Sequence, residues 1–178
     1  MNTPNVRKAR TKSPLINEPA TYELEVVSIN RTLAKVARTN QLTCKYRDIQ
    51  TSQEFIDYIA LNQFLRDEDD EFELDTNNER KLDVESSRKM VEDKVEDLIG
   101  SMIGINKGEE FALLFDDDDG LYPTQSITDK QRKSLGDEVV CLDDLVGLKF
   151  VATIALKGDR LRITKSYTTQ DGVEIINA

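Results

Sequence analysis

The sequence of 178 residues contains no histidine and no tryptophan, and it has only two cysteines and eight glycines. Without histidine, the chain cannot build a serine–histidine or cysteine–histidine nucleophile, a histidine general base or a zinc site that uses imidazole. Two cysteines do not complete a structural zinc site either. Hydrolysis by paired carboxylates is the main catalytic chemistry left open, so we expect a protein that is not an enzyme and that uses no cofactor.

Long apolar runs are missing as well. No stretch approaches 18 consecutive apolar residues, which predicts that no helix crosses a membrane. The basic residues near the N-terminus have no apolar stretch behind them, so we expect no secretory signal. Cys44 and Cys141 lie far apart, which favours a reduced, cytoplasmic setting over a disulfide framework.

Charge is abundant and is sorted along the chain. Residues 1–49 carry 9 Lys/Arg against 4 Asp/Glu, a net charge of +5. Residues 50–130 carry 8 against 23, a net charge of −15, and residues 131–178 carry 7 of each sign. A basic surface attracts phosphates, whereas an acidic surface repels them or attracts a basic protein. The sequence therefore predicts surfaces with different partners.

The first 50 residues predict a flexible basic arm followed by strands. Residues 1–19 combine three prolines with four Lys/Arg and little apolar content. From Ala20, apolar and polar residues alternate with the period of a strand, and 33–36 and 42–49 are two further candidate strands. We expect residues 20–178 to form a single α+β domain.

The centre of the chain predicts two helices. Thr51 and Glu54 have the spacing of a capping box, and apolar residues at helical spacing follow over 52–66. A longer apolar stripe predicts a second helix over 80–103. We therefore expect an acidic helical insertion at 51–104, with a solvated connection between its helices.

The last third predicts strands and turns. A short apolar run at 110–115 indicates a strand, and residues 149–156 and 161–167 alternate on either side of a glycine turn, as in a β-hairpin. No internal repeat is apparent. The whole pattern predicts a small antiparallel β-barrel or sheet that carries the two-helix insertion.

Four consecutive aspartates, Asp116 to Asp119, suggest a metal site. A calcium-binding EF-hand loop needs oxygen ligands at positions 1, 3 and 5, glycine at 6 and glutamate at 12. Counted from Asp116, position 5 is Gly120 and position 12 is Ile127. The run does not fit that loop, and a solvated turn is the favoured interpretation, ahead of a divalent-cation site and of a contact with a basic partner.

Basic and aromatic residues gather in the predicted strands and their turns. Such a combination is typical of surfaces on which single-stranded nucleic acids stack, although it also occurs on the polar face of an ordinary half-buried sheet. The candidate nucleic-acid-binding residues are Arg31, Lys35, Arg38, Lys45, Arg47, Arg160, Arg162 and Lys165 for phosphates, with Tyr22, Tyr46 and Tyr167 for bases.

The stretch from Leu145 to Tyr167 runs through Leu-Val-Gly-Leu-Lys-Phe into a strand, a turn and a basic strand. In this it resembles the C-terminal part of phage-encoded single-stranded DNA-binding proteins of the OB-fold type. The resemblance implies an OB-like five-stranded barrel, stacking of bases on the strand face, and a role in phage DNA replication. That family often ends in an acidic tail that recruits replication proteins, whereas residues 171–178 here are barely acidic.

The leading hypothesis is thus a non-catalytic accessory protein that binds single-stranded DNA or RNA in phage or bacterial replication, recombination or transcription. The alternative is an acidic interaction protein, a DNA mimic or an inhibitor that engages a basic host or replication protein through Asp67–Glu71 and Asp116–Asp119. A Mg²⁺-dependent carboxylate enzyme ranks last, because no second acidic cluster lies at a strand end where two metals are bridged.

Overall fold

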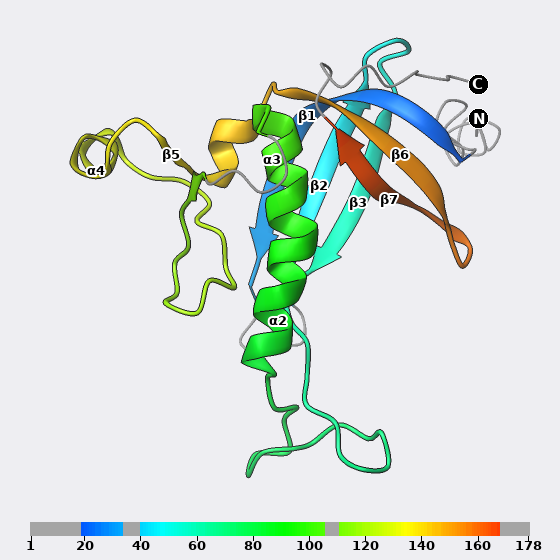
Figure 1. Ribbon diagram of the computed structural model, residues 1–178, viewed down its shortest axis with the longest axis vertical. Helices are drawn as coiled ribbons and strands as arrows, with labels where there is room; N and C mark the ends of the chain where they lie inside the picture. The colour runs from blue at the N-terminus through cyan, green and yellow to red at the C-terminus, as the bar shows by residue number, and fades with distance from the viewer. Residues whose placement is uncertain (1–18, 34–39, 106–110, 168–178) are drawn as a thin grey trace, which may run out of the picture.

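A five-stranded antiparallel sheet and one long helix dominate the computed structural model, which describes residues 19–33, 40–105 and 111–167 (Figure 1). The sheet has the order β3-β2-β1-β6-β7. Its strands are β1 (Ala20–Thr32), β2 (Gln41–Asp48), β3 (Glu54–Ala60), β6 (Lys149–Lys157) and β7 (Arg160–Tyr167). The chain is therefore α+β, as its sequence predicts.

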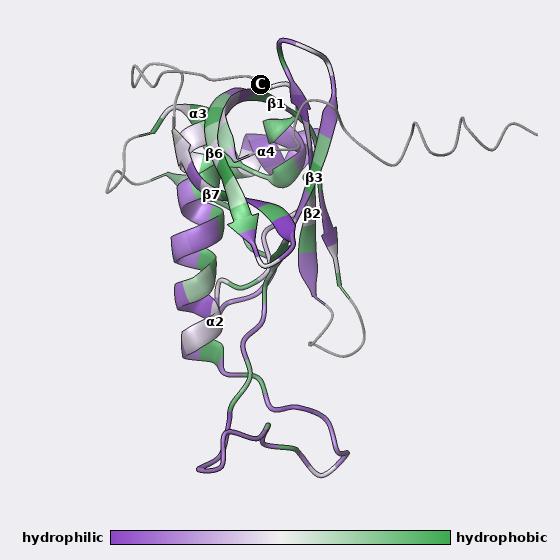
Figure 2. Ribbon diagram, turned by 90° about the vertical axis from the view of Figure 1, so that its right-hand side faces the viewer, coloured by the Kyte–Doolittle hydropathy of each residue, from purple (hydrophilic) through white to green (hydrophobic). Residues whose placement is uncertain are grey.

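The long first strand holds the sheet together because it pairs with two neighbours. Its first half pairs with β6, from Ala20 opposite Ile154, and its second half pairs with β2, ending with Thr32 opposite Gln41. The register shifts between Val26 and Ser28, and such a bulge bends and twists a strand. The bend curves the sheet, so that one face becomes concave and encloses the core (Figures 1 and 2).

A continuous helix covers the concave face. It comprises α2 (Val84–Met90), the π-helical turn η2 (Val91–Glu96) and α3 (Asp97–Ile103). The Asp83 side chain caps its start by accepting from the backbone N–H of Ser86, and Gly104 ends it with a φ of 81°, the left-handed conformation that glycine adopts without strain. The helix expected over 80–103 is confirmed, with its start at Val84.

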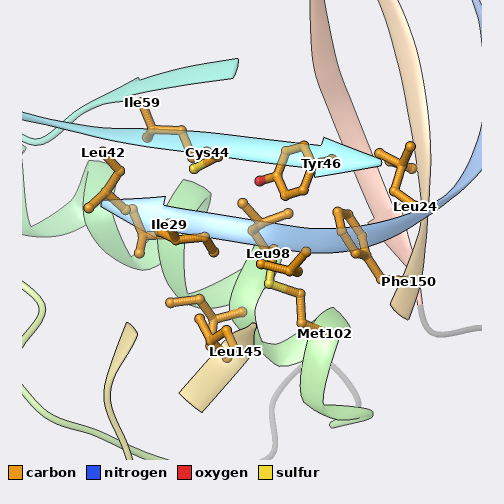
Figure 3. Packing of buried hydrophobic residues seen from close by; sticks show 14 of the residues in the cluster. Leu24, Ile29, Leu42, Cys44, Tyr46, Ile59, Leu98, Met102, Leu145 and Phe150 are labelled. Carbon is orange, nitrogen blue, oxygen red and sulfur yellow. The ribbon is translucent and has the colours of Figure 1, made fainter. Parts of the chain in front are cut away.

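The core lies between this helix and the sheet. Leu98 and Met102 of α3 face Phe150 of β6 and the side chains of β1, and Leu145 of the short 3₁₀ helix η3 (Leu142–Leu145) packs beside them (Figure 3). Burying an apolar side chain of this size stabilises a fold by about 1.5–3 kcal/mol. The apolar stripe of the helix is therefore core packing.

The first predicted helix is wrong, because residues 54–60 form β3. Phe55, Asp57 and Ile59 point inward and alternate with exposed neighbours, and the strand pairs along its whole length with β2. The predicted cap does not form: the Thr51 hydroxyl donates to Asp48 Oδ2 in the tight turn between β2 and β3. The expected insertion thus contains one helix, and its first half belongs to the sheet.

The predicted C-terminal hairpin is confirmed, since β6 and β7 pair from Val151–Tyr167 to Lys157–Arg160.

The strand expected at 110–115 is shorter than predicted. Within 111–115, the part of this stretch that the structure describes, only β4 (Ala112–Leu113) forms, paired in parallel with β5 (Val139–Val140). A further helix, α4 (Asp129–Leu135), begins at a capping box between Thr128 and Gln131 that the sequence analysis did not find. The candidate strand at 33–36 lies mostly outside the described residues.

Residues 64–82, hereafter the acidic arm, project from the body as a narrow ribbon that is mostly hydrophilic (Figures 1 and 2). Two turns of the same form follow each other at a spacing of eight residues. Asp67 accepts from the backbone N–H groups of Asp69 and Glu71, and Asp75 accepts from those of Asn77 and Glu79. Here the structure reveals a short repeat that the sequence analysis overlooked.

Two arginines pack on one aromatic ring inside the acidic arm. The guanidinium groups of Arg66 and Arg80 lie 4.0 and 3.8 Å from the centroid of the Phe72 ring, and Phe64 meets the same ring edge-on. Cation–π contacts of this kind contribute about 0.5–1 kcal/mol each at exposed sites. The arm therefore has a small packed centre, although eight of its 19 residues are acidic.

The sheet does not close into a barrel by backbone pairing within the described residues, because β3 and β7 are its two outer strands and share no ladder. None of the helices in the described ranges is long and apolar enough to cross a membrane.

Candidate nucleic-acid interface

Two of the predicted stacking residues belong to the core. Tyr22 and Tyr46 are both 0% exposed, and the Tyr46 ring meets Phe150 edge-on at 5.2 Å and stacks on Phe55 at 6.4 Å. The expectation that they stack on bases is wrong, because neither ring offers a face to solvent. Alternation alone marked them as strand residues and did not tell which face of the strand was buried.

Arg31 anchors the aspartate-rich loop rather than presenting a free charge. Its guanidinium group forms an ion pair with Asp116 and donates to the backbone carbonyl of Pro123 at 2.9 Å. Gln125 adds to this junction by accepting from the Arg31 backbone N–H and donating to the carbonyl of Ile29, both at 2.8 Å. A phosphate at this point competes with a carboxylate already in place.

The aspartate run itself holds its own loop. Asp117 accepts from the backbone N–H groups of Leu121 and Tyr122, while Asp119 lies 3.5 Å from the Arg88 guanidinium on α2. Burial raises the pKa of Asp116, but hydrogen bonds from Arg31 and Thr124 outweigh it and leave that pKa below its ordinary value. The described residues contain no cluster of His, Cys, Asp and Glu arranged to hold a metal ion.

Lys45 and Arg47 lie together on the convex face of β2. Each is flanked by carboxylates: Lys45 Nζ is 3.4 Å from Glu54, and Arg47 is 3.0 Å from Glu25 and 3.9 Å from Glu54. The paired side chains are 29–41% exposed, so water screens these attractions. The two cations are therefore held loosely and lie within reach of a ligand.

Two exposed apolar side chains of β3 lie beside these cations. Tyr58 is 41% exposed opposite Thr43, and Ile56 is 45% exposed opposite Lys45. Neither was among the predicted site residues, because 52–66 were expected to form a helix. The signal was present in Phe-Ile-Asp-Tyr-Ile, a run of aromatic and β-branched residues that favours a strand. We call Lys45, Arg47, Ile56 and Tyr58 the convex patch.

Arg162 joins the two outer strands of the sheet. Its Nε lies 2.5 Å from Asp57 Oδ1, and its guanidinium group also donates to the backbone carbonyl of Tyr58. The Asp57 carboxylate in turn accepts from the backbone N–H of Tyr58 at 2.9 Å and from that of Ile163 at 3.4 Å. We call these contacts between β3 and β7 the seam. Because Arg162 is engaged in the seam, it is not free to bind a phosphate.

The remaining predicted residues divide between the β6–β7 hairpin and the β1–β2 connection. Arg160 is exposed directly after the turn, opposite Lys157, and makes no ion pair with a residue that the structure describes. Lys165 is exposed on β7, and Tyr167 ends that strand opposite Val151. Lys35 and Arg38 lie outside the described residues.

The thiols of Cys44 and Cys141 are protonated and unreactive. Burial raises the pKa of Cys44 to about 12, and burial together with a hydrogen bond to Asp144 raises the pKa of Cys141. A protonated thiol is a poor nucleophile and a poor metal ligand.

No family model, no curated protein and no solved structure matches the chain.

Proposed function

We propose that this protein binds single-stranded nucleic acid without catalysis, on the convex patch of β2 and β3. The observation that carries the proposal is the exposed Tyr58 ring on the same face of the sheet as two loosely held cations. Single-strand binding proteins combine aromatic platforms, on which bases stack, with positive charges that track the backbone.

We further propose that the sheet is an OB-like partial barrel. Its support is the connectivity, in which a β1-β2-β3 meander is followed by a helix and by a hairpin that returns to β1. The OB fold is a five-stranded, partly open Greek-key barrel that binds oligonucleotides on the face of strands 2 and 3 and with the loops after strands 1 and 4. In this chain those are the convex patch, the connection 33–40 and the turn beside Lys157 and Arg160.

The carboxylates of the face do not block such binding. Exposed ion pairs contribute about 0–1 kcal/mol, so a phosphate displaces Glu54 or Glu25 at little cost. Stacking one base on an aromatic side chain is worth about 1–3 kcal/mol. We therefore expect modest affinity that depends on both Tyr58 and salt.

The test is fluorescence anisotropy with a labelled oligo(dT) at several salt concentrations. If the phosphate contacts are Lys45, Arg47, Lys157 and Arg160, log K falls against log salt with a slope of about −3. Tyr58→Ala should weaken binding about tenfold or more. Removing an exposed leucine of α4 by Leu135→Ala should change nothing, which makes it the matched control.

The proposal fails if the wild-type protein does not bind at low salt, or if Tyr58→Ala and Leu135→Ala bind equally well. A double-stranded oligonucleotide of the same length is the second probe. Equal affinity for the duplex contradicts a stacking mode, because paired bases do not expose their faces.

A second candidate function is favoured by the acidic arm. It carries eight carboxylates against three basic residues and projects clear of the body (Figure 1). A protruding segment with an excess of negative charge fits a basic protein surface, in the manner of a DNA mimic. In this case the arm, and not the sheet, is the functional surface.

The two functions are separated by neutralising the outer acids of one turn while keeping Asp67, which holds it. The variant Glu68→Gln, Asp69→Asn, Asp70→Asn should lose a protein captured from lysate by the wild type, yet keep its oligonucleotide affinity. The control Asp129→Asn, Asp137→Asn, Glu138→Gln removes the same charge from exposed positions outside both acidic runs. Capture that survives the arm variant, or that the control variant also loses, contradicts the second function.

A further inference from the structure

A groove of about 1220 Å³ runs between the long helix and the two outer strands of the sheet. Its walls are η2 and α3 on one side and β3 and β7 on the other, with apolar side chains such as Leu98 and Ile163 between them. Pockets for small ligands usually measure about 300–1,000 Å³. The size and the elongated walls fit a segment of polypeptide better than a small molecule.

The β3 wall presents a short open edge to the groove. The hydrogen-bonded pairs of β3 and β2 include Leu61 with Asn40 and Asp48 with Gln53, so alternation turns the N–H and C=O of Tyr58 and Ala60 away from β2. The seam uses the backbone groups of Tyr58, while those of Ala60 face the groove beyond it. An exposed strand edge is a template for a further strand.

The helix wall is acidic, with four carboxylates beside the single cation Lys94. Glu92, Asp93, Glu96 and Asp97 line the groove, and none of them forms an ion pair with a residue in the described part of the chain. By contrast, the carboxylates of Glu25, Glu54, Asp57, Asp116, Asp119 and Asp144 are all paired with Arg or Lys.

The burial and the negative charge of this wall change the pKa of one of its carboxyl groups. Burial, followed by the negative charges of Glu92 and Asp97, raises the pKa of Glu96. A ligand that brings positive charge to this wall relieves the repulsion, whereas a phosphate aggravates it. The groove and the convex patch therefore favour ligands of opposite charge.

We infer that the groove receives an extended basic segment of a partner protein, which adds a strand at the open edge of β3 and directs alternate Lys or Arg side chains at Glu92, Asp93, Glu96 and Asp97. Strand addition of this kind obtains affinity from main-chain hydrogen bonds and specificity from alternate side chains. Lys165 on β7 and Lys157 at the end of β6 also line the groove, and they disfavour the reverse placement, with the charges facing β7. This inference does not depend on the nucleic-acid function proposed above.

The experiment uses the full chain and a fluorescein-labelled peptide of eight residues in which lysine alternates with valine and threonine. The wild type should bind it, and Glu92→Gln, Glu96→Gln should bind about tenfold or more weakly, since two charge-assisted contacts are lost. The matched control Asp118→Asn, Glu138→Gln, which removes two exposed charges outside the groove, should bind as the wild type does.

A second peptide separates strand addition from simple charge attraction. It has the same sequence with N-methyl groups at alternate residues, which removes ladder donors and leaves the charge unchanged. The inference predicts at least a tenfold loss for this peptide. It is overturned if the methylated peptide binds equally well, if both charge variants lose affinity to the same extent, or if the unmodified peptide does not bind.

Discussion

The convex patch and the seam use the same kinds of residue in different surroundings. On the convex patch, Arg47 and its partner Glu54 are each 41% exposed and lie 3.9 Å apart. In the seam, Arg162 is 37% exposed, but Asp57 is only 5% exposed, and the two atoms lie 2.5 Å apart. One arginine is available to a ligand, whereas the other is part of the fold.

The difference lies in the carboxylate. An exposed carboxylate that loses its cation is solvated by water at little cost, but a buried one keeps the full penalty of an unpaired charge. The loss of a cation therefore affects stability at the seam and binding at the patch.

The largest effect is expected for Arg162→Leu. It leaves the Asp57 carboxylate buried without its cation and removes the link from β7 to the carbonyl of Tyr58, so the free energy of unfolding should fall by about 3 kcal/mol. Urea unfolding followed by circular dichroism measures this. Arg160→Leu, which changes an exposed arginine two residues away, should cost less than about 0.5 kcal/mol.

The substitution of Asp57, the partner of Arg162, tests which member of the pair sets the cost in stability. Asp57→Asn keeps the shape of the side chain, and Arg162 is free to turn toward water, so a smaller loss of about 1–2 kcal/mol is expected. Equal losses for Asp57→Asn and Arg162→Leu contradict the idea that the buried carboxylate, rather than the pair, sets the cost.

The seam also shows which strands could be predicted from the sequence alone and which could not. Alternation predicts β1, β2 and the β6–β7 hairpin because one face of each strand is apolar. It does not predict β3, where the inward position 57 is an aspartate that interrupts the apolar pattern. That aspartate is tolerated because Arg162, 105 residues away, neutralises it, and no local pattern reports such a partner.

The candidate site has the same limit. The sequence identified Lys45 and Arg47 as basic residues on a strand, but the contribution of Tyr58 depended on recognising β3. Arg31 and Arg162 carried equal weight in the sequence and are both engaged by carboxylates from distant segments. Composition identifies the cations of a surface, and only the folded chain shows which of them are already paired.

An effect of intermediate size on stability is expected for a substitution of Asp116. Like the carboxylates of the convex patch, Asp116 is exposed, but like Asp57 it connects segments that are distant in the sequence. Its carboxylate receives Arg31 from β1 and the hydroxyl of Thr124, and it is 46% exposed. Asp116→Asn should lower the free energy of unfolding by about 1 kcal/mol. The control is Asp118→Asn, which changes an exposed aspartate of the same run and should have no measurable effect.

The same carboxylate predicts a pH dependence. Hydrogen bonds lower the pKa of Asp116 below its ordinary value of 3.8, and bonds from the Cys141 backbone and Arg132 outweigh burial to lower that of Asp144. A lowered pKa in the folded state means that the stabilisation is complete above pH 3.8 and is lost as the pH falls below it. Stability measured from pH 6 to pH 2 should therefore fall less steeply in Asp116→Asn than in the wild type.

The smallest effect is expected for Glu54→Gln, which tests nucleic-acid binding directly. Glu54 lies against both Lys45 and Arg47, so Glu54→Gln releases two cations of the convex patch and should leave stability within about 0.5 kcal/mol. If phosphates bind there, affinity for oligo(dT) should rise about two- to fivefold at low salt, and the gain should shrink at high salt, where charges are screened. Asp118→Asn makes the same change in net charge from outside the patch, and it should raise the affinity less because Coulomb attraction weakens with distance. A rise seen equally in both variants reflects only the net charge of the protein, whereas a rise confined to Glu54→Gln assigns the phosphates to the convex patch.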